Sequence, residues 1–390
     1  MLLYDTRYRS LTIQVIAVIG FVSLLAWLTS NTIQNLHELG KPFTFVFLGR
    51  RAGYDINQRL IEYTSDSTHA RAALVGILNT ALVAVLGCAL ATLIGVTMGI
   101  LRLSKNWIVA KLASIYVETF RNVPVLLWIL LFFAVLSEIT PEPRAFKGEN
   151  PSAHMWLFDS IAVTNRGIFV PMPLFSSGAG IIAIVLLLSV VAAFLFRRYA
   201  GVKQAETGQI LPVFWINLGL IIVPALAAFL LLGRPVALEY PVLKGFNFQG
   251  GLLLRNSFTA LWLALSVYTG TYIAEIVRAG ILAISKGQTE AAYALGLRPG
   301  RTTNLVILPQ ALRVIIPPLI SQYLNITKNS SLAIAIGYMD VRATLGGITM
   351  NQTGRELECV LLLMGFYLLV SLTISMLMNW YNARVALVER

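Results

Sequence analysis

The chain has 390 residues, of which 57% are hydrophobic and only 12% are charged, and its formal net charge is +12. A soluble domain with that composition would expose large apolar patches, so the composition excludes an ordinary soluble protein and indicates a protein that faces lipid. The positive charge by itself is compatible with nucleic acid or an anionic membrane, but its distribution along the chain argues against nucleic acid.

Long apolar stretches divide the chain into about eight predicted membrane-spanning helices. A span needs roughly 20 apolar residues to cross ~30 Å of hydrocarbon, and these stretches are continuous rather than alternating, which argues against spanning strands. The fold class is therefore predicted to be an all-α polytopic membrane protein. In chain order, the predicted spans are 11–30, 73–101, 123–136, 180–196, 211–233, 258–282, 311–326 and 359–381.

The first span follows Arg7 and Arg9, as a secretory signal would. No small-x-small cleavage site follows it, and the apolar stretch is long for a signal peptide. We expect it to remain as an N-terminal anchor helix, followed by an outer loop, in residues 1–72.

Lys and Arg concentrate in the short segments that lie on one side of the membrane in this eight-span arrangement. The outer segments are together longer, hold slightly fewer basic residues, and nearly balance them with Asp and Glu. Basic residues in short loops mark the cytoplasmic side, which places both termini in the cytoplasm. The inner basic residues are Arg7, Arg9, Arg102, Lys105, Lys111, Arg121, Arg197, Arg198, Lys203, Lys286, Arg298, Arg301, Arg313, Arg384 and Arg390.

Two patterns predict how individual spans are built. Gly95 and Gly99 form a small-xxx-small step in the second span, which favours close packing against a neighbouring helix. Pro317-Pro318 would break the seventh span early and kink it. Between the third and fourth spans, five prolines in residues 139–179 favour irregular backbone outside the membrane.

The cysteines and histidines show no pattern of a metal site. Cys88 and Cys359 fall inside predicted spans and are expected to be buried packing residues without a disulfide. His37, His69 and His154 lie in predicted loops without a partner at ligand spacing, so no metal is expected.

The inner loop 283–312 contains a short predicted helix at 287–295. Ser285 can cap its start, with Gln288 three residues later completing a capping box, and Gly296 and Pro299 end it. Alanines make this helix slim, and Glu290 stands in its first turn, where the helix dipole favours a negative charge. The helix is too short to span the membrane, so it must lie beneath it or dock on a partner.

These residues resemble the cytoplasmic loop of permease subunits in ATP-binding-cassette importers. The shared pattern is Glu290-Ala291-Ala292, then Gly296 four residues later, then Leu308-Pro309, with Val306 where the family usually has isoleucine. In that family the loop docks in a cleft of the ATPase subunit and transmits its closure. The resemblance therefore assigns coupling to these residues and to Gln288.

Other stretches are similar to the polar amino acid branch of these permeases, the histidine/glutamate/glutamine group: 79–80, 118–124, 272–280, 308–313 and 324–333. The resemblance covers five spans and implies the type I importer permease fold. Three added spans resemble the layout of general L-amino-acid permease subunits of Gram-negative inner membranes. We therefore expect a permease core in 73–138 and 256–390, the latter with the coupling loop 283–312, separated by an insertion, 139–255.

The resemblance also implies the partners and the mechanism. The chain would translocate L-amino acids across the inner membrane by alternating access, fed by a periplasmic amino-acid-binding protein and driven by cytoplasmic ATPase subunits. The sequence has no G-x-x-x-x-G-K-[ST] motif, so we expect no bound cofactor and no enzyme activity here, and a partner subunit would hydrolyse ATP with Mg²⁺. One coupling loop requires a second permease subunit, either a copy or, in a heterodimer, a related chain.

Two charged pairs have i,i+3 spacing near the cytoplasmic ends of spans: Glu275 with Arg278, and Glu118 with Arg121. Charges in spans are costly and often functional, but arginine near a helix end can reach the headgroups. We expect structural or gating pairs, and direct contact of Glu275 and Arg278 with substrate is the alternative.

The polar run 325–331 interrupts the seventh apolar stretch and supports two hypotheses. In the first, the span ends there and Lys328 reaches the outer headgroups. In the second, a broken helix restarts at Ser330 or Ser331, and its N-terminus binds the substrate carboxylate together with Lys328 and Asn329. The sequence leaves both open.

Two other function classes compete with the importer. An ion-coupled secondary transporter of small polar solutes would explain the spans and Glu275 but not the coupling helix. A membrane enzyme or an assembly scaffold would need a polar catalytic cluster or long docking domains, and the sequence shows neither.

Overall fold

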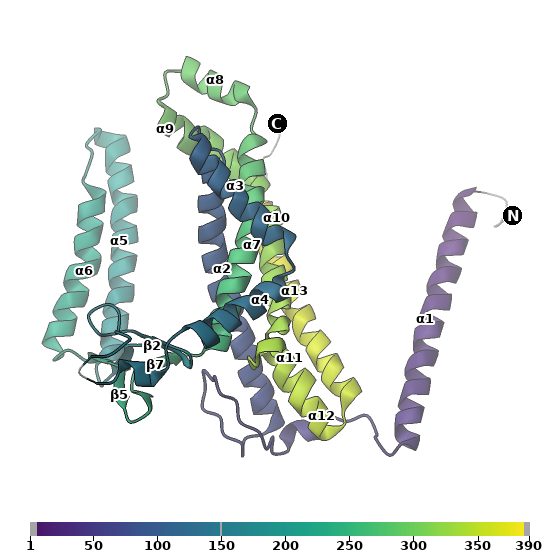
Figure 1. Ribbon diagram of the computed structural model, residues 1–390. Helices are drawn as coiled ribbons and strands as arrows, with labels where there is room; N and C mark the ends of the chain where they lie inside the picture. Colours follow the sequence, from purple (N-terminus) through teal and green to yellow (C-terminus); the bar gives the residue numbers. More distant parts are fainter. Residues whose placement is uncertain (1–5, 149, 386–390) are drawn as a thin grey trace. The chain divides into compact units, whose positions relative to one another are not determined.

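The computed structural model describes residues 6–148 and 150–385 (Figure 1). Arg390, one of the basic residues behind the topology prediction, lies outside this range. The chain divides into two compact units: Met1–Phe132 with Ala260–Arg390, and Phe133–Thr259.

Seven helical stretches in the described residues are long and apolar enough to cross a membrane, and a bent helix pair makes eight if it counts as one span. The predicted order holds, and the predicted number of about eight is reached only when the bent pair is counted as one span. The seven stretches are α1 (Thr6–Glu38), α2 (His69–Leu101), α5 (Ala179–Thr207), α6 (Val213–Leu231), α7 (Asn256–Leu282), Pro299–Ile336 and α13 (Glu356–Val385).

The third predicted span, 123–136, covers only the second half of a bent helix pair, because the apolar stretch continues a helix that begins at Trp107. Helix α3 (Trp107–Asn122) is followed by α4 (Val125–Ala134), which continues into η2 (Val135–Ile139). The bend of 102° lies between α3 and the stretch formed by α4 and η2. Val123 is extended at the break (φ −108°, ψ 134°). A residue before proline avoids the helical region, so Pro124 fixes the place of the bend.

The stretch Pro299–Ile336 is built from α9 (Pro299–Thr302), η4 (Thr303–Ile307), α10 (Leu308–Asn329) and η5 (Ser330–Ile336). The predicted break at Pro317-Pro318 is wrong, because α10 continues through both residues. Membrane helices tolerate internal proline where neighbouring groups satisfy the freed backbone carbonyls. The remaining short elements of this unit are η1 (Val46–Gly49), α8 (Lys286–Ala294), α11 (Val341–Ala343), η6 (Thr344–Thr349) and α12 (Met350–Thr353).

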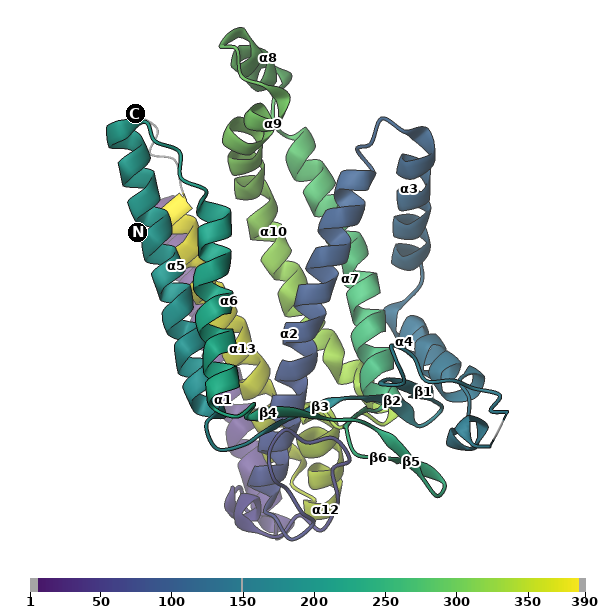
Figure 2. The same cartoon turned by 90° about the vertical axis from the view of Figure 1, so that its left-hand side faces the viewer.

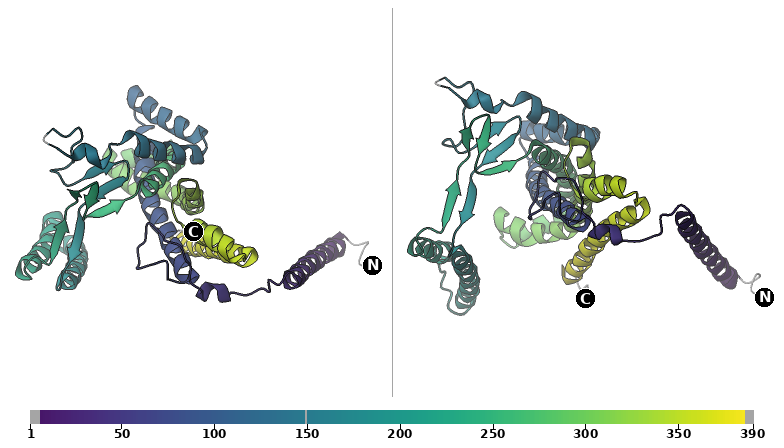
Figure 3. Two further views of the ribbon diagram at one scale, coloured as in Figure 1. Left: turned by 60° about the horizontal axis from the view of Figure 1, so that its bottom comes forward. Right: turned by 90° about the horizontal axis from the view of Figure 1, so that it is seen from below.

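The other unit contains short strands that the sequence did not predict (Figures 2 and 3). Besides η3 (Pro143–Phe146), they are β1 (Ala162–Thr164), β2 (Gly167–Val170), β3 (Met172–Phe175), β4 (Val236–Glu239), β5 (Val242–Lys244), β6 (Asn247–Gln249) and β7 (Leu252–Leu254). They pair antiparallel as β1-β2-β7, β3-β4 and β5-β6.

The strands join the residues before α5 to the residues after α6. Ile168 pairs with Leu254, and Phe175 pairs with Val236. Phe169 and Phe248 are buried together in a small apolar core with Ala162. The expectation of irregular backbone in 139–179 is therefore wrong for β1, β2 and β3, although the chain remains mainly helical.

A face of small residues on α2 controls its packing against α7 and α10. Helix α2 contacts α10, and the two cross in Figure 2. A Cβ atom added to Gly95 would lie 2.5 Å from the side chain of Ile273, and one added to Gly99 would lie 2.7 Å from the carbonyl oxygen of Ala274. Those distances exclude a side chain at either position, so the predicted close packing is confirmed.

We predict that Gly95→Ala destabilises the protein, while Gly365→Ala does not. The added methyl at Gly95 forces Ile273 to shift. Overpacking of this kind lowers the free energy of unfolding by about 1–3 kcal/mol. Gly365 lies in α13, and a Cβ added there meets no described atom within 4 Å. Thermal unfolding of both variants in detergent measures the difference, and equal midpoints would contradict the packing described here.

Candidate functional site

Helix α8 is the short helix predicted from the coupling motif, and it begins one residue earlier than expected. Its C-terminus is closed by backbone geometry. Gly296 has φ +75°, its N–H donates to the Tyr293 carbonyl oxygen at 2.9 Å, and the Leu297 N–H donates to the Ala292 carbonyl oxygen at 3.1 Å. These two bonds form a Schellman motif, which needs a left-handed residue at Gly296.

The start of α8 differs from the predicted capping box. Ser285 occupies the N-cap position with extended backbone (φ −61°, ψ 142°), but its side chain makes no capping hydrogen bond. The Gln288 side chain instead accepts a hydrogen bond from Nε2 of Gln310 in α10 at 3.3 Å. The capping box is wrong because Gln288 has a tertiary partner, which ties α8 to α10.

Most of α8 faces outward. Ala292 is 3% exposed, whereas Leu295 is 82% and Tyr293 is 48% exposed, and Glu290 and Ala291 are also exposed. Leu308 and Pro309 are exposed at the start of α10. Exposed leucine and tyrosine on a helix outside the spans, beside a free carboxylate, form a surface suited to a protein partner.

The Glu275–Arg278 pair is present, and it belongs to a larger network. Arg278 Nη2 lies 2.9 Å from Glu275 Oε1, and Arg102 pairs with Glu275 Oε2. Arg102 ends α2 and donates through Nε to the Ser114 hydroxyl of α3 at 3.3 Å. Both carboxylate oxygens are therefore engaged, and the network joins α2, α3 and α7. Sequence reasoning missed Arg102, which lies 173 residues from its partner.

The predicted Glu118–Arg121 pair is wrong. No ion pair joins them in the part of the chain that the structure describes. The Arg121 guanidinium lies over the ring of Tyr272, 5.3 Å from its centroid. The aromatic face of α7 replaces the carboxylate, and a cation over such a ring is attracted by its quadrupole. Glu118 is exposed.

The broken helix predicted at Ser330 or Ser331 is also wrong. Helix α10 continues directly into η5. The Ser330 hydroxyl donates to the Thr327 carbonyl oxygen and the Ser331 hydroxyl to that of Lys328, each at 2.8 Å. Serine side chains that bond backward along the same helix leave no free N-terminus at this point.

The actual break comes at Gly337, where φ is +69°, and the next helix, α11, is capped by Asp340. Asp340 Oδ1 accepts the Ala343 N–H at 2.8 Å. Burial raises the pKa of Asp340 to about 7, partly offset by backbone hydrogen bonds to the carboxylate and by the charge of Arg342. A glycine followed three residues later by aspartate is the signal that could have located this break.

Asn79 and Thr80 of α2, which belong to the stretches that resemble amino acid permeases, bind the backbone just after the break at Gly337. Asn79 Nδ2 donates to the Met339 carbonyl oxygen at 2.9 Å and to the Gln58 carbonyl oxygen at 2.8 Å. Thr80 Oγ1 accepts the Val341 N–H at 3.1 Å. These side chains therefore fix three separate segments of the chain at one point.

One face of α10 carries polar side chains at positions i, i+4 and i+7: Ser321, Asn325 and Lys328 are all exposed. Asn325 Nδ2 donates to Gln322 Oε1 at 3.4 Å. Lys328 has no ion pair among the described residues, whereas Ser330 is buried and Asn329 is partly buried. Polar side chains in a span cost free energy when they face lipid. These four residues (Ser321, Gln322, Asn325, Lys328), called the polar stripe below, are therefore suited to contact with another protein chain or with water.

The cysteines are unpaired, as predicted. Cys88 packs against the cluster of Ile273 and Ile315, and Cys359 against that of Phe47 and Val341. His69 is buried rather than in a loop, and its Nδ1 lies 3.0 Å from the Thr349 hydroxyl. Across residues 6–148 and 150–385, no three His, Cys, Asp or Glu side chains are grouped as metal ligands would be.

The chain is similar to known proteins. Residues 204–387 match the family described as the inner membrane component of binding-protein-dependent transport systems. The chain is 55% identical to the glutamate/glutamine/aspartate/asparagine transport system permease protein BztB of Rhodobacter capsulatus, over 100% of this chain and 96% of that protein.

Two further relatives are also similar over nearly their full length. Identity is 47% to the general L-amino acid transport system permease protein AapQ of Rhizobium johnstonii, over 100% of this chain and 95% of the relative. It is 45% to the putative amino-acid ABC transporter permease protein YhdX of Escherichia coli, over 98% and 95%. The chain therefore belongs to the family of inner membrane permease components of binding-protein-dependent transport systems.

Proposed function

We propose that the chain is the permease subunit of an ATP-binding-cassette importer that carries L-amino acids inward by alternating access. The observation that carries the proposal is α8, a short helix outside the spans that exposes Glu290 and Ala291, is followed by the exposed Leu295, and is closed by a Schellman motif at Gly296. The names of the relatives, which refer to amino acid transport systems, support this substrate class.

Coupling follows from how α8 is attached. Gln288 bonds to Gln310 at the start of α10, and three residues link α8 to the end of α7. Closure of a cytoplasmic ATPase against α8 would therefore move both α7 and α10. ATP with Mg²⁺ is hydrolysed on the ATPase subunits, a periplasmic amino-acid-binding protein delivers the substrate, and this chain performs no catalysis.

The polar stripe of α10 is proposed to line the substrate path beside a second permease subunit, a related chain in a heterodimer. Every amino acid carries a carboxylate, and the ammonium of Lys328, which has no ion pair with a residue in the described part of the chain, offers it a point charge. Asn329, the buried Ser330 and the partly buried Ser331 lie beside it, and the two serines, whose hydroxyls bond to the backbone of the same helix, would act by shaping the helix.

Glu275 separates this proposal from an ion-coupled transporter. A proton- or sodium-carrying carboxylate must be free to change partners, yet both oxygens of Glu275 are held by Arg278 and Arg102. The network is therefore proposed to be a structural or gating element rather than a substrate contact, and Glu118 and Arg121 are not part of it.

Orientation follows from the basic loops, with both termini and the α5–α6 turn in the cytoplasm. A reporter enzyme that is active only outside the cytoplasm should be silent when fused at Lys203 or after Arg390, and active at Lys147. Reporter activity in intact cells, normalised to expression, measures this. Activity at Lys203 with silence at Lys147 would reverse the proposed orientation.

We predict that Gly296→Leu uncouples ATP hydrolysis from uptake, because a side chain at φ +75° costs about 1–2 kcal/mol and disfavours the Schellman closure. Uptake per ATP hydrolysed should fall about tenfold in reconstituted vesicles, while membrane insertion and assembly persist. Gly300→Leu is the matched control, because Gly300 is helical and a Cβ there meets no described atom within 4 Å. Equal coupling in both variants would remove α8 from the mechanism.

For Lys328, the prediction is that Lys328→Met reduces uptake of every substrate alike, while Lys328→Arg retains much of it. Methionine keeps the apolar stem and removes only the charge, so a lysine that merely reaches headgroups would tolerate the change. Uptake of several amino acids, measured with basal ATPase activity as the assembly control, distinguishes the two. Wild-type transport by Lys328→Met would refute a carboxylate site at Lys328 and leave the headgroup interpretation.

A further inference from the structure

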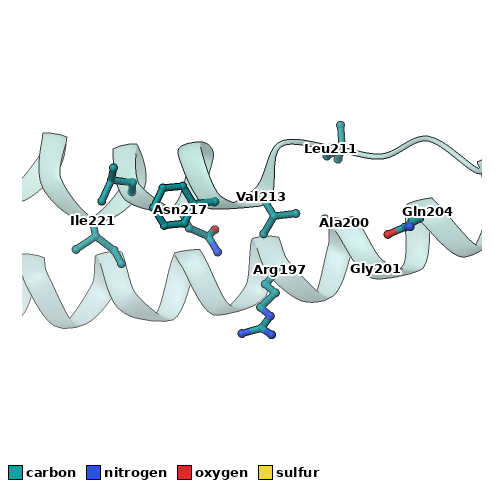
Figure 4. A pocket seen from close by; sticks show the side chains of 10 residues that line it. Arg197, Ala200, Gly201, Gln204, Leu211, Val213, Asn217 and Ile221 are labelled. Carbon is teal, nitrogen blue, oxygen red and sulfur yellow. The ribbon is translucent and has the colours of Figure 1, made fainter. Parts of the chain in front are cut away.

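The antiparallel helices α5 and α6 enclose a groove of about 620 Å³ near the turn that joins them (Figure 4). Helix α5 contributes Arg197, Ala200, Gly201 and Gln204 to its wall, and α6 contributes Asn217 and Phe214 among other side chains. The groove is open because Ala200 and Gly201 are small: a Cβ added to Gly201 would meet no described atom within 4 Å. The groove lies entirely within one compact unit.

Two polar groups in the groove lack partners. The exposed Arg197 side chain forms no ion pair with any described residue, and Oδ1 of Asn217 is buried without a hydrogen bond among them. The neighbouring cations are engaged differently, because Arg198 lies over the Phe194 ring at 5.0 Å and Lys203 over the Tyr199 ring at 5.9 Å. Of these three basic residues, Arg197 is the one that lines the groove, at its rim, and in Figure 4 its guanidinium extends away from α6.

Arg197 lies where the apolar stretch of α5 ends, which is the position expected at the edge of a bilayer. The apolar part of α5 runs from 181 to 196, about 24 Å at 1.5 Å per residue, and Arg197 follows at once. A hydrocarbon core is ~30 Å thick, so Arg197 stands near the level of the lipid phosphates. Leu218 and Ile221 line the groove farther along α6, toward the middle of the span.

We propose that this groove binds one anionic phospholipid, with its phosphate on Arg197 and part of an acyl chain along Phe214, Leu218 and Ile221. A guanidinium can hold a phosphate through two parallel hydrogen bonds. The amide side chains of Asn217 and Gln204 line the same groove. Basic pockets between membrane helices are suited to such headgroups. The volume accommodates a headgroup and part of a chain rather than a whole lipid. The inference does not depend on the transport function or on the orientation proposed above.

The first test compares two adjacent arginines. The full-length chain, delipidated in detergent, is titrated with phosphatidylglycerol or phosphatidylcholine, and bound lipid is counted by native mass spectrometry. Phosphatidylglycerol should bind more tightly, and Arg197→Gln should weaken it about fivefold, the effect of one basic residue near a membrane. Arg198→Gln removes the same charge from the side facing Phe194 and should leave the affinity within twofold.

A second pair of variants tests the shape of the groove without changing charge. Gly201→Leu should fill the groove and reduce phosphatidylglycerol binding, whereas Gly219→Leu on α6, which does not line it, should not. Equal binding of the two lipids by the wild type, or equal losses in Arg197→Gln and Arg198→Gln, would overturn the proposal. So would full competition by millimolar inorganic phosphate, which would identify a site for a free anion instead.

Discussion

The close approach of α2 to its neighbours is the constraint on which the rest of the fold depends. Lipid removes most of the hydrophobic driving force between helices, so they associate through dense packing of small residues. A Cβ on Gly76 would lie 2.9 Å from the Asp340 carbonyl oxygen, and one on Gly95 or Gly99 would collide with α7. Without these glycines, α2 could not contact both the 337–341 turn and α7.

Polar contacts fix that helix at two places. Asn79 and Thr80 bind the backbone of the 337–341 turn, and Arg102 joins Glu275 and Ser114 at the end of α2. Such contacts set register and orientation in a membrane, where packing alone is less specific. Under the proposed function, α8 pulls on α7 and α10 against this fixed helix, so a movement at Gln288 reaches the polar stripe of α10 through one continuous helix.

The exposed surfaces differ in kind, and the difference indicates their surroundings. The polar stripe of α10 would be costly against hydrocarbon, which favours a second subunit and a substrate path. The α5–α6 hairpin is apolar along most of its length, and its charged residues begin at Arg197, as expected of helices that face lipid and end at the headgroups. Its strands, such as β3 with β4, tie the two helices together at the opposite end.

The sequence by itself determined features that arise from short-range physics. Apolar length located most of the spans, and Gly296 fixed the end of α8, because each depends on neighbouring residues alone. The bend after Asn122 also has a local cause, Pro124, but the sequence analysis did not predict it. Tertiary structure decided the partners. Glu275 is bonded to a residue 173 positions away, Arg121 lies over Tyr272, Gln288 bonds to Gln310 rather than closing a capping box, and β2 pairs with β7 across two spans. A polar side chain takes whichever partner the packed helices bring within about 3 Å, and spacing along the chain does not specify that choice.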